Sequence, residues 1–126
     1  MMNKYHNEKV VYDGIEFDSK REAKRYQQLK LMEKAGVICD LKMQVKRELI
    51  PAQYINGKCV ERAVTYTSDF EYYVLKPLRQ KTVMAEPDAM AIGQHIVEDA
   101  KGMRTDVYRL KKKLMLYKYG IRITEI

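Results

Sequence analysis

The chain has 126 residues, of which 46% are hydrophobic and 33% are charged. This composition excludes a disordered tail and predicts a single globular domain over residues 1–126. The 24 Lys and Arg outnumber the 17 Asp and Glu and leave a net charge of +7, which favours nucleic acid as a partner over an anionic membrane surface. We expect no membrane span, because no apolar run approaches the roughly 20 residues that cross a bilayer. We also expect no secretion signal, because the residues from Met1 to His6 form no apolar segment of the kind that such a signal needs.

Turn and capping residues divide the chain into short strands and two helices. In chain order, the expected elements are strands at 10–12 and 15–17, a helix from 20 to about 35, strands at 45–50, 62–74 and 94–101, a helix at 106–119 and a strand at 121–126. Asp13-Gly14 and Asn56-Gly57 predict hairpin turns. Ser19 and Thr105 are the predicted N-terminal helix caps. The segment 76–90, which contains two prolines, is predicted to be a basic loop.

Apolar residues recur at helical spacing in both predicted helices, and we expect them to be buried. The predicted buried stripes are Ala23, Tyr26, Leu29 and Met32 in the first helix and Val107, Leu110, Leu114 and Tyr117 in the second. In the strand at 62–74 the alternation predicts Asp69 on the face opposite Tyr66 and Phe70.

The stretch from Ile96 to Gly102 is an apolar strand pattern that ends in an Asp-x-Lys tripeptide. Because side chains alternate along a strand, Asp99 and Lys101 should emerge on one face, with Ala100 pointing away. A carboxylate and an ammonium group at one strand end can bind a divalent metal and position the water that it activates. Glu98 is the alternative ligand, but only Asp99 shares a face with Lys101.

The order of these elements and four motifs resemble the PD-(D/E)XK nuclease superfamily. The motifs are Phe17-Asp18-Ser19-Lys20-Arg21-Glu22-Ala23, Tyr66-Thr67-Ser68-Asp69-Phe70, Glu98-Asp99-Ala100-Lys101-Gly102 and Tyr119-Gly120-Ile121. The combination is more similar still to a family of small phage proteins of uncharacterised type, which are presumed endonucleases resembling Holliday-junction resolvases. The resemblance implies an α/β (α+β) fold with a restriction-endonuclease-like core, in which helices flank a mixed central sheet.

Carried over to this sequence, the resemblance implies a Mg²⁺ site, at which Mn²⁺ can substitute. Its implied catalytic residues are Glu22, Asp69, Asp99 and Lys101, and its implied metal ligands are Asp69, Asp99, Glu22 and the carbonyl of Ala100. Two alternatives stay open. The separation of Asp69 from Asp99 is long for this family, so Asp88 could be the first carboxylate, although it lies in a proline-containing loop. Glu22 follows Ser19 by three residues and could instead close a helix capping box.

The resemblance and the basic charge together predict a metal-dependent DNA endonuclease. Branched DNA or Holliday junctions in phage recombination or replication are the expected substrates, cut by a homodimer in the cytoplasm of a bacterial host. The candidate phosphate contacts are Lys20, Lys24, Lys111 and Lys112, and the plain alternative for each is a solvated helix face. The helix that carries Lys111 is expected to face DNA rather than the partner subunit. Other hypotheses are a general or end-specific duplex nuclease and a non-catalytic nucleic-acid-binding protein.

Overall fold

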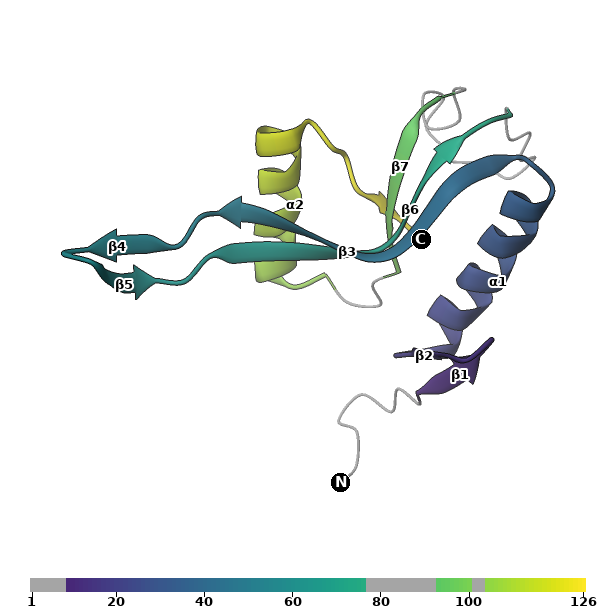
Figure 1. Ribbon diagram of the computed structural model, residues 1–126, viewed down its shortest axis with the longest axis horizontal. Helices are drawn as coiled ribbons and strands as arrows, with labels where there is room; N and C mark the ends of the chain where they lie inside the picture. Colours follow the sequence, from purple (N-terminus) through teal and green to yellow (C-terminus); the bar gives the residue numbers. More distant parts are fainter. Residues whose placement is uncertain (1–8, 77–92, 101–103) are drawn as a thin grey trace. The chain divides into compact units, whose positions relative to one another are not determined.

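The structure, a computed structural model, describes residues 9–76, 93–100 and 104–126 (Figure 1). It has the mixed α+β fold that the sequence predicts. The elements are β1 (Val10–Tyr12), β2 (Ile15–Phe17), α1 (Lys20–Lys34), β3 (Ile38–Ile50), β4 (Gln53–Ile55), β5 (Lys58–Glu61), β6 (Val64–Val74), β7 (His95–Asp99), α2 (Asp106–Tyr119) and β8 (Thr124–Glu125). One four-stranded sheet has the order β3-β6-β7-β8, and β7 and β8 run parallel in it.

The chain divides into two compact units, which are described separately below. The α1 unit lies within residues 1–41 and 72–95, and the α2 unit lies within residues 42–71 and 96–126. Strands β3, β6 and β7 contribute residues to both units. The expectation of one domain over the whole chain stays a prediction.

The α1 unit forms around the first predicted hairpin and helix. Asp13 and Gly14 both have positive φ, 55° and 75°, as the tight turn between β1 and β2 requires. Ser19 caps α1 by accepting a hydrogen bond from the backbone N–H of Glu22 at 3.2 Å. Three members of the predicted stripe, Ala23, Tyr26 and Leu29, are buried, and the ring of Tyr26 contacts Phe17 of β2 at 5.1 Å between centroids.

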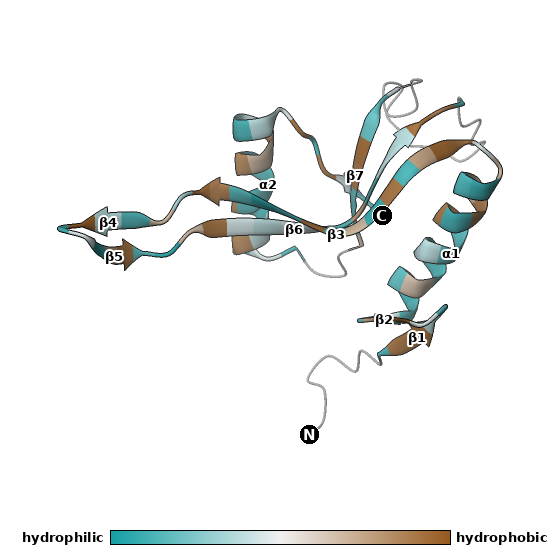
Figure 2. Ribbon diagram, in the orientation of Figure 1, coloured by the Kyte–Doolittle hydropathy of each residue, from teal (hydrophilic) through white to brown (hydrophobic). Residues whose placement is uncertain are grey.

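The core of the α2 unit lies between α2 and the sheet, but α2 does not bury the stripe that the sequence predicts. The core residues are Leu49, Tyr66, Val97, Tyr108, Met115 and Ile123. Val107, Leu110 and Tyr117 are exposed, and Leu114 is partly buried at the margin of the core. The predicted stripe is therefore wrong for most of its length. Figure 2 shows apolar and polar bands along α2, in keeping with a helix that has apolar residues on more than one side.

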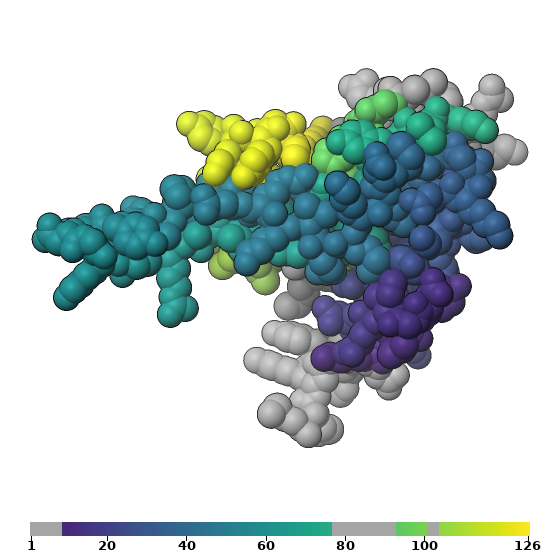
Figure 3. Space-filling model, in the orientation of Figure 1, coloured from purple at the N-terminus to yellow at the C-terminus, as the bar shows by residue number. Residues whose placement is uncertain are grey.

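The second hairpin continues the two long strands β3 and β6. β3 begins at Ile38, well before the predicted start at 45, and it alternates between more and less buried residues along its length. β4 and β5 meet at the predicted Asn56-Gly57 turn, and all of their residues are exposed. Figure 3 shows the atoms of this hairpin reaching past α2, within the same unit. Neither of the helices in the described ranges is long and apolar enough to span a membrane.

Candidate functional site

The centre of the candidate site is a hydrogen bond between β6 and the end of β7. The backbone N–H of Ala100 donates to the Oδ2 atom of Asp69 at 2.7 Å, across 31 positions of sequence. Ala100 directly follows Asp99, so this bond places Asp69 beside the residue pair at the end of β7. Two of the predicted site residues, far apart in the chain, are thereby brought together in the α2 unit.

Asp99 is held from the other side by a buried tyrosine. The hydroxyl group of Tyr66 donates to the Oδ2 atom of Asp99 at 2.5 Å, and both side chains are almost inaccessible to water. Burial raises the pKa of Tyr66 well above its ordinary value, and the hydrogen bond to the Asp99 carboxylate raises this pKa further. Tyr66 is therefore a neutral donor at all ordinary pH values, and it fixes the orientation of the Asp99 carboxylate.

Tyr108 of α2 lies in the same electrostatic environment as these two carboxylates. Burial raises the pKa of the Tyr108 hydroxyl group, and the negative charges of Asp99, Glu125 and Asp69 add to that effect. Glu98, the alternative metal ligand, is completely buried. Burial alone therefore does not separate Glu98 from Asp99, but the hydrogen bond from Tyr66 connects Asp99 directly to the α2 core.

A mixed-charge cluster joins α2 to β8 beside Asp99. In the parallel pairing of β7 with β8, Asp99 is the register partner of Glu125. Lys112 donates to Oε1 of Glu125 at 2.5 Å, and Nε of Arg104 lies 2.5 Å from Oε2. Burial alone would raise the pKa of Glu125, but the hydrogen bond and positive charge of Lys112, together with Arg104, lower it below its ordinary value.

The lowered pKa of Glu125 predicts an acid-sensitive contribution to folding. Because the pKa of Glu125 in the folded state lies below the ordinary glutamate pKa of 4.5, the stabilisation is present above about pH 4.5 and is lost as pH falls through the folded-state pKa. We expect Glu125→Gln to reduce the free energy of unfolding by about 1 kcal/mol at pH 7. The difference from wild type should shrink on acidification, as measured by urea denaturation at several pH values.

Glu61→Gln is the matched control, because Glu61 is exposed on the β4–β5 hairpin. It should change the free energy of unfolding little at pH 7, where the Glu125→Gln effect is measured. A Glu125→Gln variant as stable as wild type at pH 7 would contradict a stabilising role for the cluster.

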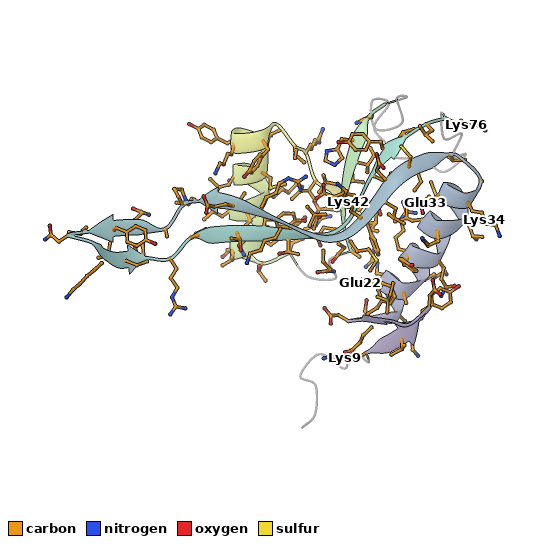
Figure 4. All side chains as sticks on the ribbon, in the orientation of Figure 1. Lys9, Glu22, Glu33, Lys34, Lys42 and Lys76 are labelled. Atoms are coloured by element: carbon orange, nitrogen blue, oxygen red, sulfur yellow. The ribbon has the colours of Figure 1, made fainter. Side chains whose placement is uncertain are left out.

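Glu22 and two of the predicted lysine contacts belong to the α1 unit. Figure 4 shows Glu22 near the start of α1, where its backbone N–H is bound by the capping residue Ser19. This is half of the predicted capping box. Lys20 and Lys24 lie on the exposed surface of α1. In the α2 unit, Lys111 and Lys112 are partly buried, and Lys112 is already engaged by Glu125.

Lys101, Asp88 and most of the predicted 76–90 loop lie outside the described residues, so the shared face of Asp99 and Lys101 stays a prediction. Within the described ranges, no group of three or more His, Cys, Asp and Glu side chains is placed to hold a metal ion. The carboxylate of Asp69 accepts a hydrogen bond from the backbone of Ala100, the residue next to Asp99, and the negative charges of Asp69 and Asp99 both act on Tyr66 and Tyr108. Mg²⁺ prefers oxygen ligands and is usually held by one or two carboxylates with several waters, so this donor pair fits it.

Sequence reasoning missed four residues of this neighbourhood. They are Tyr66, Tyr108, Arg104 and Glu125. Tyr66 belongs to the motif that contains Asp69, so the sequence indicated that it lies near the site. Arg104 and Glu125 are separated by the whole of α2, and only the position of β8 beside β7 brings them together.

Comparisons with known proteins give one match. Residues 2–125 match the model of a family described as "Protein of unknown function (DUF1064)". No curated protein and no solved structure matches the chain.

Proposed function

We propose that this chain, which belongs to the DUF1064 family of proteins of unknown function, is a metal-dependent DNA endonuclease. The observation that carries the proposal is the hydrogen bond from the Ala100 backbone to Asp69. It joins the two carboxylate-bearing strands at the position where the sequence has Asp-x-Lys. The basic net charge of +7 supports a nucleic-acid substrate.

In this proposal Asp69, Asp99 and the carbonyl of Ala100 would hold Mg²⁺, with Glu22 as a further ligand on the sequence resemblance alone. When bound, the metal supplies charge neutralisation at a phosphoryl oxygen and lowers the pKa of a bound water. Tyr66 keeps the Asp99 carboxylate in one orientation, and the Ala100 N–H does the same for Asp69. Lys101, again from sequence alone, would orient the attacking water or bind the scissile phosphate.

Arg104 and Lys112 supply positive charge at Glu125, which is the register partner of Asp99. Arg104 is the more exposed of the two, with 61% of its side chain accessible, so it can contact a phosphate while Lys112 remains bonded to Glu125. We infer that phosphate contacts at this site come from Arg104 at least as much as from Lys112. These contacts carry no base specificity, which agrees with recognition of DNA by shape.

A cleavage assay tests the proposed activity and its substrate. The protein should cut four-way junctions in preference to flaps and linear duplexes when Mg²⁺ or Mn²⁺ is present, and it should not cut when EDTA removes the metal. Equal cleavage of all three substrates would support the general duplex nuclease instead. Binding of every substrate without cleavage, in either metal, would contradict an endonuclease and leave a nucleic-acid-binding protein.

A further inference from the structure

One side of α1 carries a row of lysines that leads into a hollow of the surface. The residues of this row, which we call the α1 row, are spaced by four, three, four and three positions, so they lie on one side of the helix. They are Lys20, Lys24, Gln27, Leu31 and Lys34. The three lysines are exposed, as is 68% of Leu31. No described acidic side chain forms an ion pair with Lys24 or Lys34.

The charges of α1 favour an anionic partner. Lys and Arg outnumber Glu in the sequence of this helix, which contains no Asp. Lys20 and Arg21 lie in its first turn, where the helix dipole opposes positive charge. Lys20 and Lys24 are four residues apart, as are Arg21 and Arg25, and like charges at this spacing repel each other. An anion that binds along this side of α1 would relieve both effects.

The hollow lies beside the second half of the α1 row and has a volume of about 360 Å³. It is lined by Tyr12, Gln27, Lys30, Leu31, Glu33 and Lys34. Figure 4 shows Glu33 and Lys34 at the end of α1 that lies opposite Glu22. The charge of Glu33 is already compensated, because its carboxylate pairs with Lys30 at 3.3 Å and accepts a hydrogen bond from the backbone N–H of Leu41 at 3.2 Å. The hollow therefore keeps the positive charge of Lys34.

Tyr12 gives the hollow an aromatic wall. Its ring meets the ring of Tyr26 edge to face, with 6.2 Å between the centroids and 71° between the planes. An edge-to-face contact leaves at least one face of each ring uncovered by the other ring, and 43% of Tyr12 is exposed. Proteins bind single-stranded nucleic acid with a positively charged track for the backbone and exposed aromatic rings on which the bases stack. The α1 row and Tyr12 supply both parts.

We propose that the α1 row and its hollow form a binding site for single-stranded DNA. Phosphate groups of the strand bind Lys20, Lys24 and Lys34. One base enters the hollow and stacks on Tyr12, where the amide group of Gln27 can form a hydrogen bond with its edge. The bases of a duplex are already stacked on one another, so a duplex fits this site less well. The inference deepens the proposed function, and rests on it for DNA as the polyanion: unpaired strands would direct the nuclease to branched DNA.

Binding of a fluorescein-labelled oligothymidine of about 12 nucleotides, measured by fluorescence anisotropy in EDTA, tests the base site. Tyr12→Leu removes the ring but keeps an apolar side chain against Tyr26, and it should raise the dissociation constant about tenfold. Tyr12→Phe keeps the ring and should bind as the wild type does. Tyr54→Leu is the matched control, because Tyr54 is 64% exposed on β4 in the α2 unit, and it should leave the constant unchanged. Equal weakening by Tyr12→Leu and Tyr54→Leu would overturn the base site.

The lysines of the α1 row have a separate test in the salt dependence of binding. Lys24→Gln and Lys34→Gln should each weaken binding severalfold and lower the slope of log affinity against log salt concentration by about 0.7, the value for one phosphate contact with a single strand. Lys58→Gln removes the same charge from the exposed strand β5 and should change the slope little. A wild-type slope in both Lys24→Gln and Lys34→Gln would overturn the contact between the α1 row and the strand.

Two unlabelled competitors identify the occupant of the site. An oligothymidine–oligoadenosine duplex of the same length and a polyglutamate chain should both displace the labelled strand less well than unlabelled oligothymidine does. Equal displacement by either competitor would overturn a single-strand site.

Because EDTA prevents metal-dependent cleavage, failure of this site and failure of the proposed nuclease are distinguishable. A chain that binds oligothymidine through Tyr12 but cuts no DNA with Mg²⁺ would retain the site and overturn the nuclease. A chain that cuts junctions with Mg²⁺, but whose affinity for oligothymidine is unchanged by Tyr12→Leu, would overturn the site alone.

Discussion

Asp99→Asn should reduce metal-dependent DNA cleavage by on the order of a thousandfold. The proposed metal would contribute several kcal/mol of transition-state stabilisation, and about 4 kcal/mol corresponds to a factor of a thousand in rate. Asn keeps an oxygen that can accept the Tyr66 hydrogen bond, so the buried contact survives while the negative charge is lost. The fold should therefore persist, and the loss should lie in metal binding and catalysis.

Two measurements separate that loss from a general defect. Isothermal titration with Mn²⁺ should show binding to the wild-type protein that Asp99→Asn weakens strongly. Binding of a four-way junction in EDTA should change little, because the removed carboxylate makes no favourable contact with phosphate. Asp40→Asn is the matched control, since Asp40 is exposed on β3 and has a positive φ of 55° that Asn tolerates. If Asp99→Asn retained wild-type Mn²⁺ binding and cleavage, Asp99 would have no place in the site.

Local sequence signals predict the turns and caps of this fold well. Asp13-Gly14 and Asn56-Gly57 specify their turns through positive φ, and Ser19 and Thr105 specify helix starts by accepting backbone hydrogen bonds. Each of these effects acts within a few residues, so no tertiary information is needed. The early start of β3 is harder to predict, because Asp40 and Gln44 interrupt the strand with positive φ.

The buried side of α2 could not be predicted, because two apolar sets compete on one helix. Tyr108 and Met115 are seven residues apart, and Val107 and Leu114 have the same separation. Helical periodicity fits both sets. Which set is buried depends on the side chains of the sheet that pack against α2. Tyr66 and other core residues lie on the sheet, and Tyr108 and Met115 of α2 pack with them.

In the candidate site too, some residues could be predicted from sequence motifs, whereas others depend on how the strands align in the sheet. The motif resemblance predicts Asp69 and Asp99 as partners, and the Ala100–Asp69 hydrogen bond places their strands together. The contact between Tyr66 and Asp99 depends on how β6 aligns with β7. The position of Glu125 beside Asp99 depends on how β8 pairs with β7. Neither alignment can be predicted from the sequence spacing of the residues involved.

Arg47→Met should destabilise the protein by about 3–5 kcal/mol, because it removes the bidentate cationic partner of the buried Glu71 carboxylate. Arg47 of β3 forms a bidentate ion pair with Glu71 of β6, in which the Nη2 atom of Arg47 donates to the Oε1 atom of Glu71 at 2.6 Å. Only 18% of the Arg47 side chain and 4% of the Glu71 side chain are exposed. Ser68 also donates to Glu71, at 2.7 Å, but a neutral hydroxyl group cannot balance a full negative charge.

The double variant Arg47→Met with Glu71→Met distinguishes a buried charge from a simple loss of packing. Removing both charges leaves apolar side chains of similar volume, so it should recover most of the stability that Arg47→Met loses. Lys30→Met is the matched control, because it removes the cation of a more exposed ion pair with Glu33 and should change stability little. Urea denaturation followed by circular dichroism measures all three. If the double variant were no more stable than Arg47→Met, the loss would not come from the buried charge of Glu71. The ion pair itself would then stabilise the fold.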